Sequence, residues 1–184
     1  MIYMVDHVFA DSAAEPAWHA WYALYLHKLT AVPGIRSAQR FKALGCSPSR
    51  FLAMYTVDSA DVFTSEPYKA MGGGGSQSAR FHAAYRLWTR NLFVAARRDD
   101  TAPATTDIRA PAIAGPQRVL VFDRDRYAPS ASDALEAQAT WLESVGLHMT
   151  TKYRAFLVLD ASVSAQAAST PGSFLYEPFT PVIS

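Results

Sequence analysis

The stretch "IYMVDHVF", residues 2–9, is the part of the sequence that indicates the fold most directly. Successive side chains of a strand point to opposite faces, so one face carries Tyr3, Val5, His7 and Phe9, and the other carries Ile2, Met4, Asp6 and Val8. Both faces are largely apolar, which is typical of a strand that is covered on both sides. The stretch therefore predicts a strand inside a sheet that has other elements packed against each face.

The segments that follow continue a regular order of elements. Apolar residues at helical spacing predict helices, and runs rich in β-branched and aromatic residues predict strands. In chain order, we expect a strand (2–9), a helix ended by Pro33 and Gly34 (17–32), two strands joined as a hairpin (35–43 and 50–58), two helical segments (60–71 and 78–85) and a strand (87–96). This β-α-β-β-α-β order is that of a ferredoxin-like unit.

The second half of the chain repeats this beginning. Residues 98–116 are rich in Ala, Pro and Thr and are predicted to be a linker between the unit at 1–97 and a second one at 117–184. There "VFDR" (121–124) echoes "MVDH" (4–7). We expect a strand (117–125), a helix (130–148), an extended run (149–161) and a last strand (172–183). The fold class is therefore α+β, with a shortened second ferredoxin-like unit that packs on the first.

Composition and charge exclude several classes of protein. Half of the 184 residues are hydrophobic, only 18% are charged, and the net charge is +1, so no basic or acidic field favours nucleic acid or an anionic membrane. The single cysteine, Cys46, can form neither an internal disulfide nor a thiolate zinc site. The apolar start lacks a basic region and no run is long enough to span a membrane. We expect a soluble cytoplasmic protein.

Four consecutive glycines occupy residues 72–75, between two segments predicted to be helical. A phosphate-binding loop would follow a strand and end in Lys-Ser/Thr or a further spaced glycine, and this run does neither, so that interpretation is disfavoured. Two interpretations stay open. The run is either a helix C-cap followed by a flexible surface loop, or a mobile flap over a pocket.

None of the five histidines occurs at a spacing that would bring metal ligands together locally, and we expect neither a metal nor another cofactor. His7 is the most informative, because an imidazole on an apolar strand face requires a hydrogen-bond partner or a cavity. It is either a satisfied core residue or a functional one. His27, opposite the apolar face of its helix, is predicted to be solvated.

An aromatic stripe lies on the helix predicted at 17–32. Its rings are either the buried face of an ordinary helix or the wall of a pocket for an aromatic ligand. Phe81 is expected to face the same space, and no Ser-His-Asp triad is visible. The residues predicted to bind a substrate are Tyr3, Trp18, His19, Tyr22, Tyr25, Tyr85 and Trp88, with Trp21 in the same stripe.

The segments "MVDHVF", "AVPGI", "FLAMYTVDS" and "EPYKAM" followed by "SARFHAAYRLWTRNLF" together resemble the dimeric α/β-barrel superfamily. This superfamily includes EthD-type proteins, stress-responsive A/B barrel proteins and polyketide cyclases. The resemblance implies that two ferredoxin-like sheets join into one barrel, with helices outside and a small-molecule pocket between a sheet and its helices. Two half-barrels in one chain would make dimerisation unnecessary, but because the second unit is short we expect a homodimer that forms through the first unit.

In cyclases of this superfamily a first-strand histidine, and a tyrosine with a histidine six residues later, line the pocket. The resemblance assigns the first two to His7 and Tyr68, but Gly74 occupies the third position, so His82 is the remaining candidate. We expect a cofactor-independent enzyme in which His7 moves a proton of a small aromatic or carbonyl-containing metabolite, with Tyr68 or His82 as acid or oxyanion donor. Its reaction class would be that of an isomerase, cyclase, dehydratase or lyase.

The alternative is a non-catalytic binding or accessory protein of the same fold, which would use the aromatic wall without chemistry. A third reading is oxidation with haem or molecular oxygen, which also occurs on this fold.

Overall fold

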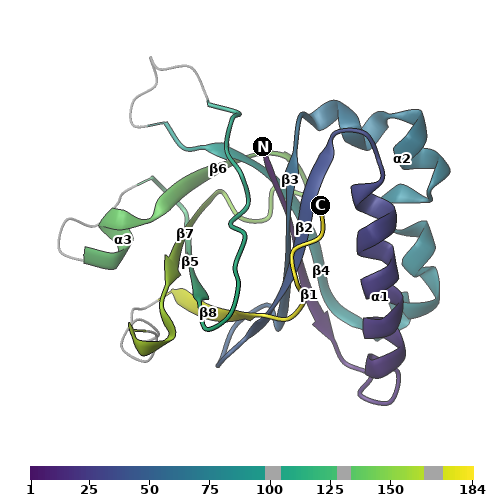
Figure 1. Ribbon diagram of the computed structural model, residues 1–184, viewed down its shortest axis with the longest axis horizontal. Helices are drawn as coiled ribbons and strands as arrows, with labels where there is room; N and C mark the ends of the chain where they lie inside the picture. The colour runs from purple at the N-terminus through teal and green to yellow at the C-terminus, as the bar shows by residue number, and fades with distance from the viewer. Residues whose placement is uncertain (98–104, 128–133, 164–171) are drawn as a thin grey trace.

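The computed structural model describes residues 1–97, 105–127, 134–163 and 172–184, and eight antiparallel strands form a closed barrel at its centre (Figure 1). Around the barrel the strands follow the order β1-β3-β2-β8-β5-β7-β6-β4. Their bounds are β1 Ile2–Phe9, β2 Ile35–Ala43, β3 Phe51–Val57, β4 Tyr85–Ala95, β5 Arg118–Arg124, β6 Thr140–Leu147, β7 Tyr153–Leu159 and β8 Ser173–Pro178.

Helical segments connect the strands and are concentrated in the first half of the chain. Figure 1 shows α1, α2 and the segment after α2 on one side of the barrel, outside the sheet of β1 to β4. The α-helices are α1 Glu15–Thr30, α2 Glu66–Ala70 and α3 Ala134–Gln138, and the 3₁₀ helices are η1 Ala60–Thr64, η2 Gly73–Ala84 and η3 Ala161–Val163. None of the helices in the described part of the chain has the length and apolarity needed to cross a membrane.

The two halves of the barrel have the same strand order. The first four strands lie as β4-β1-β3-β2 and the last four as β8-β5-β7-β6, which is the ferredoxin-like order in both cases. The halves join where β2 pairs with β8 and where β4 pairs with β6. The predicted α+β fold, a ferredoxin-like unit with a shortened second copy, is confirmed. Because these edges pair within one chain, a homodimer would need another surface, and it stays a prediction.

The helix predicted at 130–148 is wrong for most of its length. Residues 130–133 lie outside the described residues, and only Ala134–Gln138 form a helix before the chain continues as β6. In β6, Leu142 and Ser144 are buried while Val145 is exposed, and the strand pairs with both β4 and β7. Pairing two sheet edges that would otherwise lack partners stabilises an extended chain here, and this overrides the helical periodicity of the sequence.

The glycine run is a helix end followed by another helix. Gly72 has a left-handed backbone (φ +74°) directly after α2, and its N–H donates to the carbonyl of Lys69 at 2.9 Å, so the predicted C-cap is confirmed. The chain from Gly73 to Ala84 forms the 3₁₀ helix η2 instead of the predicted loop, and whether this segment moves as a flap over the pocket stays a prediction.

The described part of the predicted linker packs on the barrel. Ile113 is buried among the interior side chains, and its backbone N–H and carbonyl both pair with the Gln39 amide, at 3.0 and 2.8 Å. The Ala110 N–H donates to Thr56 Oγ1, and the N-terminal amine of Met1 donates to the Thr106 carbonyl. Residues 98–104 lie outside the described residues, and the division into two units at this segment stays a prediction.

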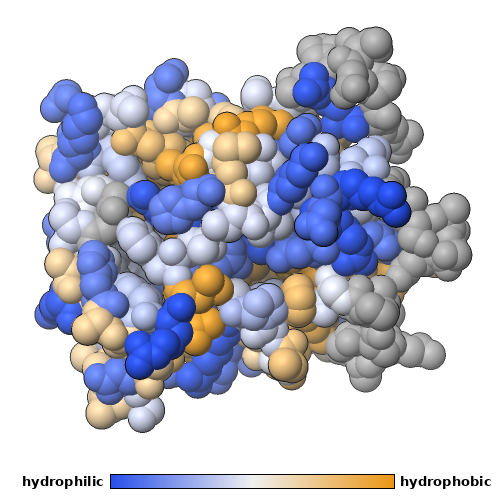
Figure 2. Space-filling model, turned by 180° about the vertical axis from the view of Figure 1, so that it is seen from behind, coloured by the Kyte–Doolittle hydropathy of each residue, from blue (hydrophilic) through white to orange (hydrophobic). Residues whose placement is uncertain are grey.

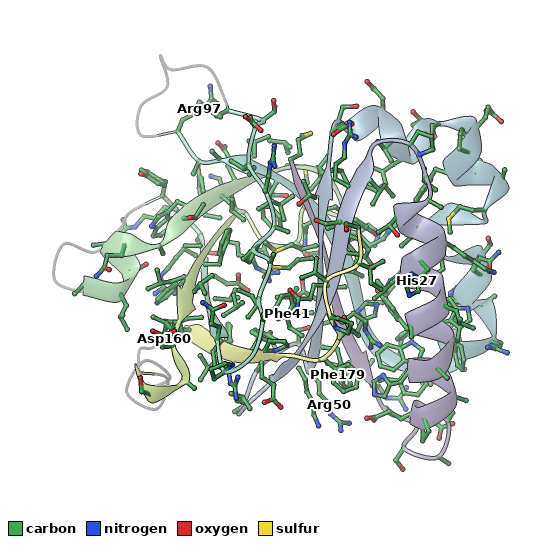
Figure 3. All side chains as sticks on the ribbon, in the orientation of Figure 1. His27, Phe41, Arg50, Arg97, Asp160 and Phe179 are labelled. Atoms are coloured by element: carbon green, nitrogen blue, oxygen red, sulfur yellow. The ribbon has the colours of Figure 1, made fainter. Side chains whose placement is uncertain are left out.

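Two hydrophobic layers lie on opposite faces of the first sheet, as the alternation in residues 2–9 predicts. Tyr3, Val5 and Phe9 pack outward against α1, whereas Ile2 and Met4 pack with Phe41 inside the barrel. Figure 3 labels Phe41. His27 is exposed on the outer face of α1, as predicted. Figure 2 shows the face opposite to that of Figure 1, where small groups of hydrophobic residues are separated by polar ones.

A buried charge cluster lies inside the barrel. The Arg154 guanidinium of β7 donates to both Asp123 oxygens of β5, at 2.7 and 2.9 Å, and to Asp6 Oδ2 of β1 at 3.0 Å. Burial raises the pKa of Asp6, and Arg154 opposes this rise. Because the three residues come from both halves, their pairing joins the two sheets across the interior.

Replacing Arg154 with methionine would leave Asp6 buried without its cation. Removing one partner of a buried ion pair costs about 3–5 kcal/mol, so we expect Arg154→Met to lower the free energy of unfolding by about this amount in urea titrations. Arg126→Met, at an exposed arginine, is the control and should change little. The double variant Asp6→Asn/Arg154→Met should recover part of the loss; an Arg154→Met protein as stable as the control would contradict the role of the cluster.

Candidate functional site

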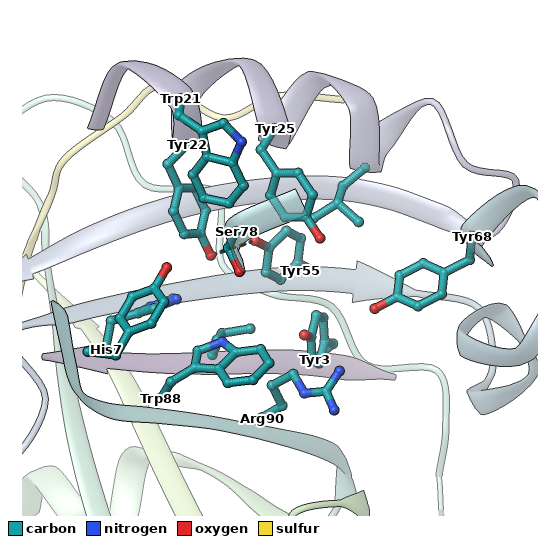
Figure 4. Close-up of a pocket in the computed structure, with 13 residues that line it drawn as sticks. Tyr3, His7, Trp21, Tyr22, Tyr25, Tyr55, Tyr68, Ser78, Trp88 and Arg90 are labelled. Carbon is teal, nitrogen blue, oxygen red and sulfur yellow. Dashed lines mark hydrogen bonds between the residues drawn. The ribbon is translucent and has the colours of Figure 1, made fainter. Parts of the chain in front are cut away.

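A pocket lies between the outer face of the first sheet and the helices α1 and η2 (Figure 4). Its cavity volume is about 30 Å³, far below the roughly 300–1,000 Å³ of ligand pockets, so a ligand would enter only if side chains of the lining move. Its described lining is mostly aromatic and has no acidic residue: Tyr3, Val5, His7, Trp21, Tyr22, Tyr25, Leu29, Tyr55, Tyr68, Ser78, Tyr85, Trp88 and Arg90.

Strand pairing and helical spacing bring these side chains together. In the antiparallel pair of β1 and β4, His7 lies opposite Trp88 and Val5 lies opposite Arg90, so these four side chains share the outer face. On α1, Tyr22, Tyr25 and Leu29 follow one another at spacings of three and four residues, so they share one face of the helix. Figure 4 shows Tyr22 and Tyr25 pointing towards that sheet. The pocket is therefore enclosed by one helix face and one sheet face.

His7 lies at one end of the pocket in an aromatic cage. Its side chain is 1% exposed, and its ring centroid is 5.3 Å from Tyr22, 5.6 Å from Trp18 and 5.8 Å from Tyr85. Among the described residues, Nδ1 has no hydrogen-bond partner. Burial lowers the pKa of His7 well below its ordinary value, the positive charge of Arg40 lowers it further, and an interaction with the Val5 backbone opposes this shift. The imidazole is therefore neutral at physiological pH and has bonding capacity left for a ligand.

Arg40 of β2 lies behind this cage, and the sequence analysis did not identify it. Its guanidinium is buried against the ring faces of Tyr22 and Trp18, with Cζ at 4.0 and 4.6 Å from the centroids. Nη2 lies 3.3 Å from His19 Nδ1, and His19 Nε2 lies 3.3 Å from Glu15. One neutral tautomer of His19, protonated on Nε2, satisfies both contacts. In the described structure no carboxylate lies within 4.0 Å of Arg40, so its charge acts on the site.

The tyrosines around the pocket are protonated hydroxyl donors. Burial raises the pKa of Tyr22 to about 12, and burial also raises the pKa values of Tyr3, Tyr25 and Tyr55. Tyr22 and Tyr55 share a hydrogen bond of 3.1 Å. Burial raises the pKa of Tyr85 as well, although hydrogen bonds with Trp18 and Ser78 oppose this. Phenolic O–H groups in a dry pocket are suitable donors to an anionic oxygen.

Ser78 and His82 connect the pocket with the surface. Ser78 lines the pocket on η2, and its Oγ is 2.9 Å from His82 Nε2. His82 itself is exposed and lies over Trp88, with 5.8 Å between the ring centroids. The predicted His82 is therefore linked to the pocket through Ser78 and does not line it.

Tyr68 lies at the far end of the pocket from His7 (Figure 4), so it does not adjoin the imidazole, and the hydroxyl-bearing rings nearest to His7 are Tyr22 and Tyr85. The η2 backbone at Gly73 lies so close to the Tyr68 ring that a Cβ at this residue would overlap it. The four-glycine stretch thus lets the η2 backbone approach a pocket tyrosine closely.

The structure places most of the predicted substrate-binding residues on the pocket. Those that line it are Tyr3, Tyr22, Tyr25, Tyr85 and Trp88, together with His7 and Tyr68 of the predicted catalytic group. Trp18 packs behind the lining, stacked on Phe9, and His19 lies beyond it beside Phe179. The roles of all these residues stay predictions.

Four polar residues of the site were not predicted to act there: Arg40, Tyr55, Ser78 and Arg90. Of these four, only Arg90 could have been predicted from the sequence. It follows Trp88 by two positions on a predicted strand, so the two side chains are expected on the same face. Among the described residues, no group of three or more His, Cys, Asp or Glu side chains is arranged to hold a metal ion.

Two solved structures are similar in fold to this chain. An anthrone oxidase-like protein aligns with 100% of this chain and 92% of its own, with a TM-score of 0.54 and 12% identity. A candidate monooxygenase from Lactobacillus acidophilus aligns with 97% of this chain and 94% of its own, with a TM-score of 0.45 and 9% identity. No protein-family model and no curated protein matches the sequence. The first similarity supports the barrel fold.

A side chain at residue 73 would displace the Tyr68 ring. We expect Gly73→Ala to lower the free energy of unfolding by about 1–3 kcal/mol, the usual cost of overpacking, and to change the near-UV circular dichroism of the buried tyrosines. Gly45→Ala is the matched control, because a Cβ there meets no atom within 4 Å. Equal stability of the two variants would show that Tyr68 does not depend on the close approach of Gly73.

The buried neutral imidazole makes stability depend on pH. Because the pKa of His7 is lowered from 6.5 on folding, the unfolded chain binds the proton more readily, and stability is lost as pH falls below about 6.5. We expect wild type to lose up to about 1.4 kcal/mol more per pH unit than His7→Gln between pH 6.5 and 5. Urea titrations at several pH values measure this difference, and parallel curves for the two proteins would exclude a lowered pKa.

Proposed function

We propose that this protein is a cofactor-independent enzyme that removes a proton from a small phenolic or carbonyl-containing aromatic metabolite. The observation that carries the proposal is the buried, neutral imidazole of His7, which has an unpartnered nitrogen in the described structure and lies at the end of a pocket lined by phenols. A neutral imidazole is a general base, and nearby O–H donors stabilise the anion that results.

The aromatic lining supports this class of substrate. Trp21 and Tyr25 stack at 4.9 Å on the helix side, and Trp88 lies on the sheet side of the same pocket. A planar ring between these faces would gain offset stacking and exclude water. Because the cavity volume is only about 30 Å³, such a ring would have to displace side chains of the lining as it enters.

The proposed step moves one proton. A C–H or O–H of the substrate transfers its proton to His7, and the electron pair left behind becomes the charge of an enolate or phenolate oxygen. Tyr22 and Tyr85, the hydroxyl-bearing rings nearest to His7, donate to that oxygen, and the Arg40 charge stabilises it through the ring of Tyr22. In an isomerisation, the proton then returns from His7 to another atom of the anion. In a cyclisation, the carbanion attacks a carbonyl carbon of the same molecule, a C–C bond forms as the C=O π bond breaks, and the proton passes from His7 to the resulting alkoxide.

One of the structures with a similar fold is that of an anthrone oxidase-like protein, and this suggests oxidation as a second candidate reaction. The same anion could react with molecular oxygen, so that a ring CH₂ becomes a carbonyl with one oxygen atom and the other oxygen atom leaves as water. A third candidate is a binding protein that holds the aromatic ligand without chemistry, which the aromatic lining would equally support.

Hydrogen exchange tests the step that the two enzymatic candidates share. With anthrone in D₂O, we expect the protein to accelerate exchange of the ring CH₂ protons, followed by NMR under argon, and His7→Gln to lose about 10²–10⁴-fold of that rate. His27→Gln, at an exposed histidine on the same helix as the aromatic stripe, is the control. Binding of anthrone without accelerated exchange would favour the binding protein, and oxygen uptake in air would favour the oxidation.

A further inference from the structure

Arg90 places a positive charge on the pocket. It follows Trp88 by two residues on β4 and lies opposite Val5 of β1, and its side chain lines the pocket beside Trp88 and Tyr3 (Figure 4). The guanidinium carbon is 5.0 Å from the centroid of the Trp88 ring. The cation therefore lies next to an aromatic surface on which a ligand ring could stack.

The contacts of Arg90 do not neutralise this charge. Its Nε and Nη2 lie 3.4 and 3.3 Å from His148 Nε2, and its backbone N–H is 3.3 Å from His148 Nδ1. Burial and the charge of Arg90 lower the pKa of His148, which keeps this imidazole neutral. A neutral imidazole has one nitrogen lone pair, so it can accept from the guanidinium or from the backbone N–H but not from both.

Several other cations on the same half of the molecule have a carboxylate partner, whereas Arg40, like Arg90, has none in the described structure. Arg50 pairs with Glu15 at 2.8 Å, Arg36 pairs with Asp58, and Lys69 pairs with Glu66 at 2.9 Å. For Arg90, no carboxylate of the described residues lies within 4.0 Å, and the described pocket lining contains no acid. The described pocket lining thus contains hydrogen-bond donors and the positive charge of Arg90 but no negative charge, so an anionic ligand would complement it.

We propose that Arg90 binds the carboxylate of an aromatic acid, which stacks its ring on Trp88 and directs the ring towards His7. A guanidinium holds a carboxylate through two parallel N–H donors, and this would replace the weak contact with His148. The inference rests on the proposed function, because it names the substrate class of the same pocket. It accounts for a cation on an otherwise uncharged and aromatic pocket wall.

Two probes that differ in charge but hardly in shape test the assignment. We expect wild type to bind 1-naphthoate about ten- to a hundred-fold more tightly than 1-naphthamide by titration calorimetry, the range of a charge-assisted hydrogen bond. Arg90→Gln should lose this preference while keeping its affinity for the amide. Arg86→Gln, at an exposed arginine on the same strand that does not line the pocket, should keep the preference. Arg90→Lys should keep part of it, because lysine supplies the charge without the two-pronged geometry.

Three results would overturn the assignment: equal affinity of wild type for the two probes, failure of wild type to bind 1-naphthoate, or an unchanged preference in Arg90→Gln. The proposed function can fail separately. A normal preference for 1-naphthoate together with no accelerated hydrogen exchange of anthrone would refute proton abstraction and would leave the carboxylate site in place.

Discussion

The contact of Arg154 with Asp6 and Asp123 is the constraint on which the arrangement of the first strand depends. A buried carboxylate is tolerated in the barrel only beside its cation, so Asp6 must face inward. Because neighbouring residues of a strand face opposite sides, His7 must then face outward, into the space under α1. A register slip of one residue would place the imidazole in the barrel and the carboxylate among aromatic rings. Stability inside the barrel thus fixes the position of the candidate base outside it.

The two halves of the barrel have the same strand order, but equivalent residues make different contacts in each half. When "VFDR" (121–124) is aligned with "MVDH" (4–7), Asp123 corresponds to Asp6 and Arg124 corresponds to His7. Both aspartates bind Arg154, but Arg124 pairs with Glu136 of the short helix α3 at 3.0 Å and has no counterpart of the aromatic cage around it in the described residues. The second half retains the strands that close the barrel, and the long helix that forms the pocket roof is found in the first half.

The sequence predicts local features well and distant contacts poorly. The strands at 2–9 and 35–43 have the predicted bounds, because alternation and turn residues are local signals. The helix predicted at 130–148 is wrong because β6 pairs with β4 and β7, and the sequence of 130–148 alone does not show these partners. Ile113 lies in a segment predicted to be a linker, because the interior side chains that bury it come from distant parts of the sequence. The aromatic wall is visible from helical spacing. The burial of Arg40 is not visible, since an arginine on a strand usually faces solvent and this one is covered by residues far away in the sequence, on α1 and at Phe179.

In the proposed reaction, the charges around the pocket would also limit which acids His7 deprotonates. Arg40 makes an imidazolium at His7 less favourable, so the lowered pKa makes His7 a weaker base as well as a neutral one. Proton transfer from a neutral substrate is favourable only if the same positive charge, with the phenolic donors, stabilises the new anion more than it destabilises the imidazolium. This condition is met best by substrates whose negative charge spreads over an aromatic ring, because such anions need little further stabilisation and stack on the same surfaces as the neutral form. If the proposed function holds, the electrostatics and the aromatic lining would therefore favour the same chemical class of substrate.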